Sequence, residues 1–353
     1  MALTQVDQGL LGTYAQYTGF KNRLINGACV IDQRNAGASV SNTGAVAYTI
    51  DRWYSQGVSS AGVFSCQQVT DAPTGFSYSE KLTVTTNSTP SGTQAYKYIQ
   101  RIEGYNLADF NLGLSTCASF TLSFWVKSSL TGTFGGSFWG AGATRWFVFS
   151  YSISSANTWE YKTVTITPIT SGSFDTTNGT GLQLTFNIGA GSSSLTTANA
   201  WNSGSTEYYG PTGQTNIIST NGATWQVTGV QLEKGSTATS FDYRPYGTEL
   251  GLCQRYFEQV GDVVGGSTAQ SLFVDSYSAG ASTSQFNWFY RQQKRAAPTI
   301  ALYGTLSTSN VSGGVGVLGV TTITACIYAN PASAGRLYWY NNVASGYSAS
   351  AEL

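Results

Sequence analysis

The chain of 353 residues contains no histidine and few charged side chains. The lack of histidine excludes Ser-His-Asp and Cys-His nucleophilic arrangements, histidine acid-base catalysis and histidine-containing zinc sites. Charged residues make up 10% of the chain and the net charge is zero. Such a balance gives no electrostatic attraction for nucleic acid or an anionic membrane. We therefore expect neither as a partner.

Long apolar runs are also missing. No stretch reaches the roughly 18 apolar residues of a membrane-spanning helix. The N-terminus lacks the basic segment and apolar run of a signal peptide. The five cysteines are odd in number, far apart and form no CxxC pair. We interpret them as reduced thiols that serve as small apolar side chains, which fits folding in a reducing cytoplasm.

Glycine, with 41 residues, and aromatic residues, at 14%, are abundant. This composition is typical of short strands joined by tight turns. Phe120, Leu122, Phe124 and Val126 alternate with polar residues and Trp125, and the same period of two recurs along residues 23–245. The pattern predicts an all-β fold in which a jelly-roll-type β-sandwich occupies residues 23–245.

The end of this region contains a change of phase. The apolar residues Trp225 and Val227 give way to Val230 and Leu232 across Gly229. A one-residue slip at a glycine predicts a β-bulge in the last strand of the sandwich. The sequence predicts further short strands in the runs ACVID, VAYTIDRWY, GVFSCQQV, EKLTVTT and AYKYIQRIE.

Residues 246–353 read as a smaller C-terminal distal β domain. Its candidate strands are SLFVDSYS, SQFNWFYRQ, PTIALYG, TTITACIYA and RLYWYNN, whereas the glycine-rich run SNVSGGVGVLGV indicates a flexible loop or irregular hairpin. Thr248 is positioned to cap a short helix, TELGLCQRYF, with Leu250, Cys253 and Phe257 on one face. Residues 1–22 are too short for a domain and predict an extended arm for attachment or assembly.

Charged residues cluster between the two regions. Asp242, Arg244, Glu249 and Arg255 are interpreted as an inter-domain joint whose ion pairs fix the angle between the domains. The alternative is a set of solvated loop charges that contribute little.

Several runs resemble a family of bacteriophage virion proteins of the tail-fibre or receptor-binding type. The resemblance spans roughly residues 20–257 and rests on the runs KNRLINGACVIDQRNAG, YTIDRWY, QRIEGYNLADF, TLSFWVKSSLTGTFGG, ANTWEYKTVTI and GATWQVTGVQLEKGSTATSFDYRPYGTELGLCQRYF. The middle region is similar to a carbohydrate-binding-module type of jelly roll. The C-terminal runs QQKRAAPTI and SASAEL match the distal segment of such fibres more loosely. The resemblance implies no catalytic residues.

The aromatic residues fall into two groups. Trp53, Trp125, Trp159 and Trp225 lie in strand patterns and are expected in the core. A second group lies in or beside Gly/Ser-rich loops and provides candidates for glycan binding by stacking on sugar rings, with packing under turns or at subunit contacts as the alternative. Its members are Trp139, Trp146, Trp201, Tyr208, Tyr209, Tyr338, Trp339 and Tyr340.

The carboxylates of the chain raise two chemical possibilities besides structural roles. A glycan depolymerase needs two carboxylates roughly 5–10 Å apart across a cleft, and the pairs Asp51 with Glu103 and Asp109 with Glu160 are candidates without a distinguishing spacing. A structural Ca²⁺ ion would find oxygen ligands in the runs DQRNAG and DTTNGTG, but neither has a ligand-loop signature. We therefore predict no catalytic residues, no metal ligands and no cofactor.

The sequence leads to a non-enzymatic structural protein of a phage particle, a tail fibre or spike-like appendage that attaches to host cell-surface glycan. The alternatives are a capsid decoration or head fibre protein without receptor binding, and a depolymerase. We expect a homo-oligomer, with a trimer favoured, that binds other virion proteins through the N-terminal arm. It would be made in the host bacterial cytoplasm and located in the virion.

Overall fold

The computed structural model describes residues 21–57, 61–140, 142, 144–261, 273–278, 283–340 and 345–353. These residues form two compact units. The N-terminal unit contains residues 21–30, 39–49 and 53–245, and the C-terminal unit contains residues 31–38, 50–52 and 246–353. The predicted arm lies outside the described residues except for its last two positions.

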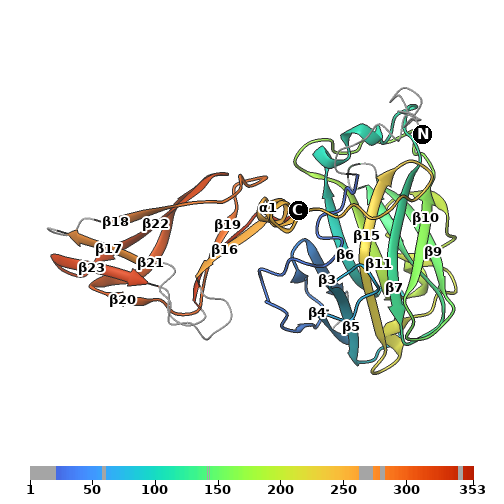
Figure 1. Ribbon diagram of the computed structural model, residues 1–353, viewed down its shortest axis with the longest axis horizontal. Helices are drawn as coiled ribbons and strands as arrows, with labels where there is room; N and C mark the ends of the chain where they lie inside the picture. The colour runs from blue at the N-terminus through green and yellow to red at the C-terminus, as the bar shows by residue number, and fades with distance from the viewer. Residues whose placement is uncertain are drawn as a thin grey trace, which may run out of the picture. The chain divides into compact units, whose positions relative to one another are not determined.

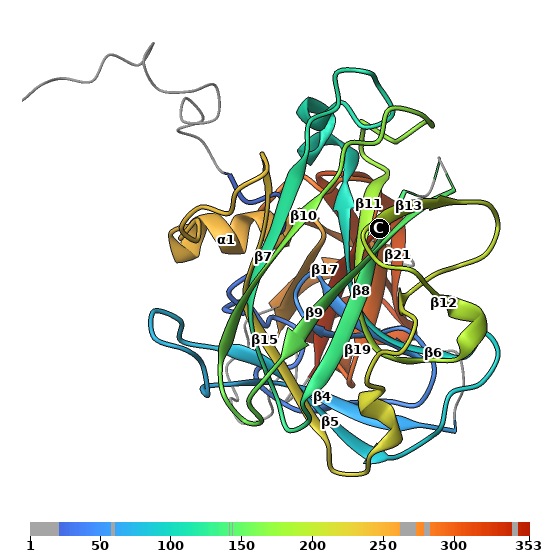
Figure 2. The same cartoon turned by 90° about the vertical axis from the view of Figure 1, so that its right-hand side faces the viewer.

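The N-terminal unit is a jelly-roll-type β-sandwich of two antiparallel sheets (Figure 1). The six-stranded sheet has the order β1 (Val40–Asn42), β4 (Val63–Val69), β5 (Ser79–Thr86), β15 (Thr224–Lys234), β7 (Phe120–Ser128) and β10 (Glu160–Ile166). The seven-stranded sheet has the order β13 (Ala200–Ser203), β9 (Arg145–Ile153), β8 (Gly132–Gly140), β11 (Thr180–Ala190), β6 (Ala95–Glu103), β3 (Trp53–Gly57) and β2 (Ala47–Ile50). The long neighbouring strands β7, β10 and β15 are also visible in Figure 2.

Short elements complete the N-terminal unit. Strands β12 (Leu195–Thr196) and β14 (Gly210–Pro211) pair in parallel. The short 3-10 helices are η2 (Gly104–Asn106), η3 (Ala108–Phe110), η5 (Ser192–Ser194) and η6 (Ile217–Ser219).

The core between the sheets follows the alternation seen in the sequence. Phe120, Leu122, Phe124 and Val126 of β7 are fully buried. Trp53 and Trp225 are buried as predicted. Trp53 stacks on Tyr98 with ring centroids 5.1 Å apart, and Trp225 donates a 3.1 Å hydrogen bond from Nε1 to the hydroxyl of Tyr151. A buried indole N–H thus has a partner, as a stable core requires.

The predicted bulge at Gly229 is present. Thr228 pairs with Trp125 of β7 and Gln231 pairs with Ser123, so three steps on β15 oppose two on β7. Gly229 has φ +61°, a backbone conformation that glycine adopts without the steric penalty of a Cβ atom. The extra residue shifts the later apolar residues of β15 back toward the core.

The described residues of the C-terminal unit form three three-stranded sheets. The first has the order β16 (Phe257–Gly261), β24 (Gly346–Ser350) and β19 (Thr299–Tyr303), and the second β17 (Phe273–Ser278), β23 (Gly335–Tyr340) and β20 (Ser307–Ser309). The third has the order β18 (Ser284–Phe289), β22 (Thr324–Pro331) and β21 (Val311–Val320). Trp288, Ile327, Leu337, Trp339 and Tyr347 form much of its core.

Three expectations about local structure are wrong. The glycine-rich run is strand β21, because its bulges, one of them beside Gly313 and Gly314 at positive φ, absorb the irregularity within a ladder on β22. The run ACVID forms no strand. The helix α1 (Tyr246–Gln254) starts two residues before Thr248, so this threonine does not cap it, and Phe257 lies on β16.

Two short segments from the first part of the sequence complete the C-terminal unit. Arg34 and Arg52 both form ion pairs with Glu352 near the end of the chain. Their guanidinium groups each lie 3.5 Å from a ring centroid, Arg34 over Phe257 and Arg52 over Tyr256. Planar guanidinium groups both pair with a carboxylate and stack on aromatic rings, which explains how so few residues join a unit that is distant in sequence.

Among the described residues, no helix has the length and apolar character needed to cross a membrane.

Candidate functional site: an aromatic groove on the six-stranded sheet

The outward face of β7 carries the first part of the site. Because Phe124 and Val126 point into the core, the alternation of the strand directs Ser123, Trp125 and Lys127 to the opposite face. The prediction of Trp125 as a core residue is therefore wrong, and so is that of Trp159, which is only partly buried. The sequence does contain a signal for the exposure of Trp125, because this residue is out of phase with the alternating apolar residues of its own strand.

Trp125 lies in an open groove of about 490 Å³. We call it the aromatic groove; its five rings are Phe76, Trp125, Tyr161, Phe241 and Tyr243, and its other lining residues are Thr74, Ser123, Gly229, Ala238, Thr239 and Ser240. Tyr161 on β10 is directly opposite Trp125, and the two ring centroids are 5.4 Å apart. The side chain of Tyr161 is 44% exposed and that of Tyr243 is 60% exposed. These rings present faces to solvent.

Three of the five rings of the aromatic groove pack against one another. Phe76 comes from the loop between β4 and β5, and Phe241 and Tyr243 come from the segment after β15. Their centroids are 5.1 Å apart for Phe76 and Phe241, 5.5 Å for Phe76 and Tyr243, and 4.9 Å for Phe241 and Tyr243. Edge-to-face and tilted contacts of this kind hold the rings in fixed orientations.

The bulge at Gly229 forms part of the floor of the aromatic groove. A Cβ atom at this glycine would lie 2.6 Å from the ring of Phe76. Only glycine combines the positive φ of the bulge with so close an approach of the ring. The sequence slip at Gly229 therefore marks a residue of the site as well as a turn of the strand.

A polar cluster lies on the same face of β7. Lys127 forms an ion pair with Asp71 and lies 5.1 Å from the centroid of the Trp159 ring. Asp71 also accepts hydrogen bonds from Gln226 Nε2 at 3.2 Å and Trp159 Nε1 at 3.4 Å. The hydrogen bond from Lys127 is the main reason that the pKa of Asp71 is lowered. The face thus combines ring surfaces with ionised and hydrogen-bonding groups.

The first set of predicted glycan-binding residues forms a closed cluster instead. We call Trp139, Trp146, Tyr208 and Tyr209 the closed cluster. Trp139 on β8 stacks on Trp146 on β9 with centroids 5.4 Å apart, and Tyr209 meets Trp146 edge-on at 5.6 Å. Trp146 and Tyr209 are each only 3% exposed. For Trp146 and Tyr209 the predicted role is corrected, because the chain itself covers the rings that a sugar would need. Trp139 and Tyr208 are partly buried, and their role in glycan binding stays a prediction.

The second set lies on β23 of the C-terminal unit. Trp339 is fully buried in the core, so its assignment to glycan binding is also wrong. Tyr338 and Tyr340 point to the other face, are partly buried, and stack with centroids 6.2 Å apart. The alternation of the strand separates the tryptophan from its two neighbours.

The residues assigned to the joint have contacts within their own units. Asp242 accepts hydrogen bonds from the backbone amides of Lys21 and Asn22 at 2.9 and 3.2 Å. Arg244 donates to the carbonyl oxygens of Asn22 and Leu24. In the C-terminal unit, Glu249 is buried on α1 and Arg255 follows the helix. The role of these residues in fixing a domain angle stays a prediction.

The carboxylates considered for catalysis are engaged in local contacts. Asp109 pairs with Arg23 at 2.9 Å. Glu160 accepts hydrogen bonds from Lys162, Ser154 and Ser155, with the Lys162 contact the largest cause of a pKa lowered to about 2. A general acid needs a raised pKa to hold its proton near neutral pH, so the environment of Glu160 opposes that role. Asp51, whose pKa burial raises to about 6, accepts from the amide and side chain of Gln33.

The two loops considered for calcium use their carboxylates to close turns. Asp32 accepts backbone hydrogen bonds from Asn35 at 2.9 Å and Gly37 at 2.7 Å. Asp175 accepts from the amide and hydroxyl of Thr177 at 2.6 and 2.8 Å. Within the part of the chain that the structure describes, no cluster of three or more Cys, Asp or Glu residues could hold a metal ion.

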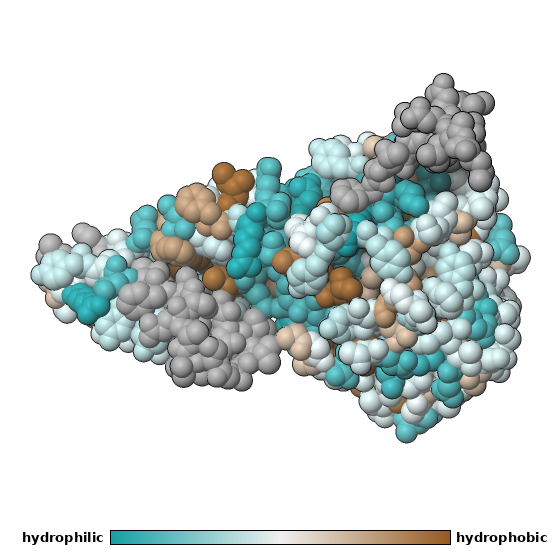
Figure 3. All heavy atoms as spheres, in the orientation of Figure 1, coloured by the Kyte–Doolittle hydropathy of each residue, from teal (hydrophilic) through white to brown (hydrophobic). Residues whose placement is uncertain are grey.

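The visible surface of the N-terminal unit is mixed in character (Figure 3). In the view of Figure 3, hydrophilic and hydrophobic side chains are interspersed over the visible face of the N-terminal unit.

No family model matches the chain, and no curated protein matches it. Twenty-six chains of solved structures do match. One is the enzymatically active domain of tailspike protein 4 of bacteriophage CBA120, with 15% identity, a TM-score of 0.32, and coverage of 61% of this chain but only 21% of the tailspike chain. A putative sugar binding protein from Bacteroides thetaiotaomicron matches with 12% identity, a TM-score of 0.38, and coverage of 61% and 100%.

A third match is TmCBM61 in complex with β-1,4-galactotriose, with 10% identity, a TM-score of 0.31, and coverage of 61% of this chain and 99% of the other. Because these identities and scores are low, the function must be argued from the side chains of this chain.

Proposed function

We propose that the chain is a non-enzymatic structural protein of a bacteriophage particle that binds glycan through the aromatic groove. The observation that carries the glycan part is the set of partly exposed rings on the outward face of one sheet, centred on Trp125 and Tyr161. Flat rings held by neighbouring rings offer apolar surface to the C–H face of a sugar, and the hydroxyls around them offer hydrogen bonds. The phage part rests on the resemblance of the sequence runs, and the location is a fibre or spike-like appendage.

The chemistry of the site fits binding better than cleavage. Phe76, Phe241 and Tyr243 fill one end of the groove, and the hydroxyl-bearing residues Ser123 and Thr239 line it. Among the described residues, none of those that line the groove has a carboxylate. A retaining or inverting glycosidase needs two carboxyl groups across the scissile bond.

Exposed apolar side chains of the C-terminal unit support assembly into an oligomer. Phe289 on β18, Leu318 on β21 and Ile323 next to β22 are 69%, 61% and 54% exposed. Contiguous exposed apolar patches mark interaction surfaces, and these three residues belong to one sheet, β18-β22-β21, or to the turn before β22. We propose a homo-oligomer, with a trimer favoured, and light scattering on the purified chain measures its mass.

Glycan binding is tested by removing two rings of the groove. Trp125→Ala and Tyr161→Ala should each weaken binding on an array of purified bacterial polysaccharides, and the Trp125 change by about 30-fold, since truncating an aromatic hot spot costs roughly 2 kcal/mol or more. Tyr105→Ala is the matched control, because it removes a tyrosine that is 61% exposed in the same unit but does not line the groove. Undiminished binding by the Trp125→Ala/Tyr161→Ala double variant would refute the assignment of the groove.

A further inference from the structure

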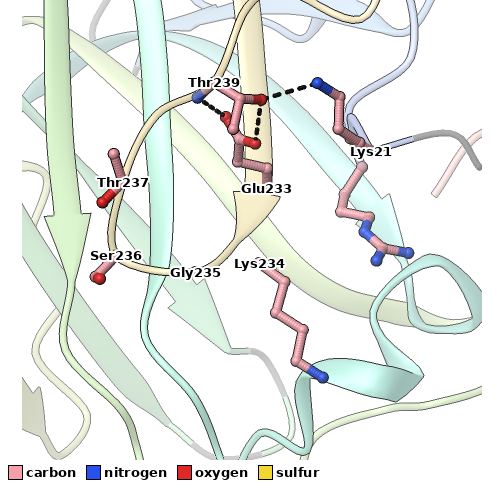
Figure 4. A pocket seen from close by; sticks show the side chains of 8 residues that line it. Lys21, Glu233, Lys234, Gly235, Ser236, Thr237 and Thr239 are labelled. Carbon is pink, nitrogen blue, oxygen red and sulfur yellow. Dashed lines mark hydrogen bonds between the residues drawn. The ribbon is translucent and has the colours of Figure 1, made fainter. Parts of the chain in front are cut away.

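A second hollow lies next to the aromatic groove. It has a volume of about 170 Å³ and shares Thr239 with the groove. We call it the basic pocket; its lining residues are Lys21, Arg23, Glu233, Lys234, Gly235, Ser236, Thr237 and Thr239. Figure 4 shows Glu233 and Lys21 both joined to Thr239, with Ser236 and Thr237 on the loop that follows β15.

Positive charge exceeds negative charge around the basic pocket. Three cationic side chains line it, Lys21, Arg23 and Lys234, against one carboxylate, Glu233. Asp109, which pairs with Arg23 at 2.9 Å and lies 3.9 Å from Lys234, adds a second negative charge. Three positive and two negative charges leave an excess of one positive charge.

The carboxylate of Glu233 is occupied by neutral donors. It accepts hydrogen bonds from the amide of Thr239 at 2.8 Å, the hydroxyl of Thr239 at 2.7 Å and Gln231 Nε2 at 2.8 Å. It therefore holds the segment after β15 in place. Neutral donors add no positive charge, so the balance of three positive and two negative side chains is unchanged. The ammonium of Lys21 contacts Glu233 through the hydroxyl of Thr239, and an anion in the basic pocket would give it a direct charged partner.

Lys21 links the basic pocket to the aromatic groove. Its Nζ donates to the hydroxyl of Thr239 at 2.9 Å and to the carbonyl oxygen of Ser240 at 3.3 Å. Thr239 and Ser240 are lining residues of the groove. The ammonium thus lies beside the wall that the two hollows share, within reach of a substituent on a sugar that stacks in the groove.

We propose that the basic pocket binds the acidic group of the glycan, a carboxylate or a sulfate ester, while the sugar rings lie in the aromatic groove. This inference rests on the proposed function and specifies its ligand class as an acidic saccharide. A neutral sugar leaves the excess positive charge unmatched, whereas an anion gains charge-assisted hydrogen bonds from Lys21 and neighbouring hydroxyls. The pocket volume is several times the roughly 30 Å³ that one water molecule occupies in the liquid, so a carboxylate or sulfate fits.

The test compares each polysaccharide with its neutralised form. Purified acidic bacterial polysaccharides are printed native, carboxyl-reduced and desulfated, and binding of the full chain is measured at about 0.1 M salt, where a surface charge still acts over roughly 10 Å. The native form should bind about fivefold more tightly than the form that lacks its acid, as expected for one solvent-exposed charge contact. The carboxyl-reduced and desulfated arms show which acid is recognised.

Two variants locate the preference. Lys21→Met should lower binding of the native form about fivefold and leave the neutralised form unchanged, and Lys21→Arg should retain the preference. Lys81→Met is the control, because Lys81 on β5 carries the same charge but lines neither hollow. Equal binding of native and neutralised forms, or an equal effect of Lys21→Met on both, overturns the inference while the aromatic groove stands.

Binding of small anions to the basic pocket can be measured separately, without a polysaccharide. D-glucuronate and sulfate, added at tens of millimolar, should shift the amide NMR signals of Gly235, Ser236 and Thr237, and methyl glucoside should not. The absence of such shifts with either anion overturns the inference even if no polysaccharide binds. If Trp125→Ala and Tyr161→Ala both bind glycan as well as the parent, the aromatic groove is not the glycan site. A failure of the proposed function is therefore distinguishable from a failure of the inference about the basic pocket.

Discussion

The closed cluster and the aromatic groove lie in the same unit and have similar compositions, yet they differ in what covers them. In the closed cluster, Tyr209 and the partly buried Leu195 pack on Trp146 and Trp139. These two covering residues come from the segment that contains β12 and β14. In the aromatic groove, the segment from Ala238 to Tyr243 lines one side, and Trp125 and Tyr161 keep exposed surface.

We infer from this comparison that coverage separates the two clusters. A covered ring contributes its apolar area to stability, whereas the uncovered rings are those proposed to bind glycan. If this is correct, substitutions in the two clusters should separate effects on stability from effects on binding.

The largest expected effect is on the stability of the closed cluster. Trp146→Ala should lower the free energy of unfolding by about 3–5 kcal/mol, since it removes a large buried side chain and leaves a cavity. Trp125→Ala, at a partly exposed ring, should cost roughly 1 kcal/mol or less. Denaturant unfolding of the two variants measures both values. Similar losses of stability in the two variants would remove the distinction between the clusters.

The second largest expected effect is a dependence of the free energy of unfolding on pH, caused by Lys97 beside the closed cluster. Lys97 Nζ lies 4.1 Å from the centroid of the Tyr209 ring, and burial lowers the pKa of Lys97 from its ordinary value of 10.5 to about 8. The unfolded chain therefore binds this proton more tightly, so stability rises as pH increases through the window from about 8 to 10.5 and is lost as pH falls through 8. Burial also raises the pKa of Tyr209, so this residue keeps its proton there.

The contribution of Lys97 between pH 7 and pH 10 is about 2 kcal/mol, since one unit of pKa corresponds to roughly 1.4 kcal/mol. Thermal unfolding of the parent and of Lys97→Met at matched pH values isolates this contribution from other titrating groups. The variant should lack the rise. Parallel profiles for the two proteins would show that Lys97 stays charged or is solvated.

The smallest expected effect sharpens the description of the aromatic groove. Gly229→Ala should destabilise the fold by roughly 1–2 kcal/mol from strain at positive φ, and it should also weaken glycan binding by displacing Phe76. Gly222→Ala is the matched control, because Gly222 also has positive φ but a Cβ atom there meets nothing within 4 Å. Equal binding by both variants would show that the position of Phe76 does not matter for recognition.

Much of the fold was predictable from local patterns. The alternation along residues 120–126 predicted β7 and its buried face, and the phase slip at Gly229 predicted the bulge. The glycine-rich strand β21 was not predictable, because glycine weakens strand propensity and only the ladder to β22 holds the segment extended. The segments around Arg34 and Arg52 join the C-terminal unit through ion pairs with Glu352, which is 318 and 300 residues away from them in sequence. Local patterns contain no information on such contacts.

The position of the candidate site was not predictable from the sequence. The sequence analysis assigned Trp146 and Trp339 to glycan binding and Trp125 to the core, whereas the structure buries the first two and exposes part of the third. For Trp125 and Trp339, the alternation of the strand is enough to predict which face the side chain points to. For Trp146 and Tyr209, alternation does not predict burial, since the covering residues come from elsewhere in the chain.

The sequence by itself determined the all-β class, because the period-two alternation of strands and the residues of turns are local properties. It also determined the bulge at Gly229, because a change of phase is visible within one strand. Only the tertiary structure decided which rings remain open, which acidic groups are occupied, and that Thr239 lies between an aromatic groove and a basic pocket. The physical reason is that exposure and charge balance depend on side chains from strands and loops distant in sequence, which the packing of the sheets and their loops brings together.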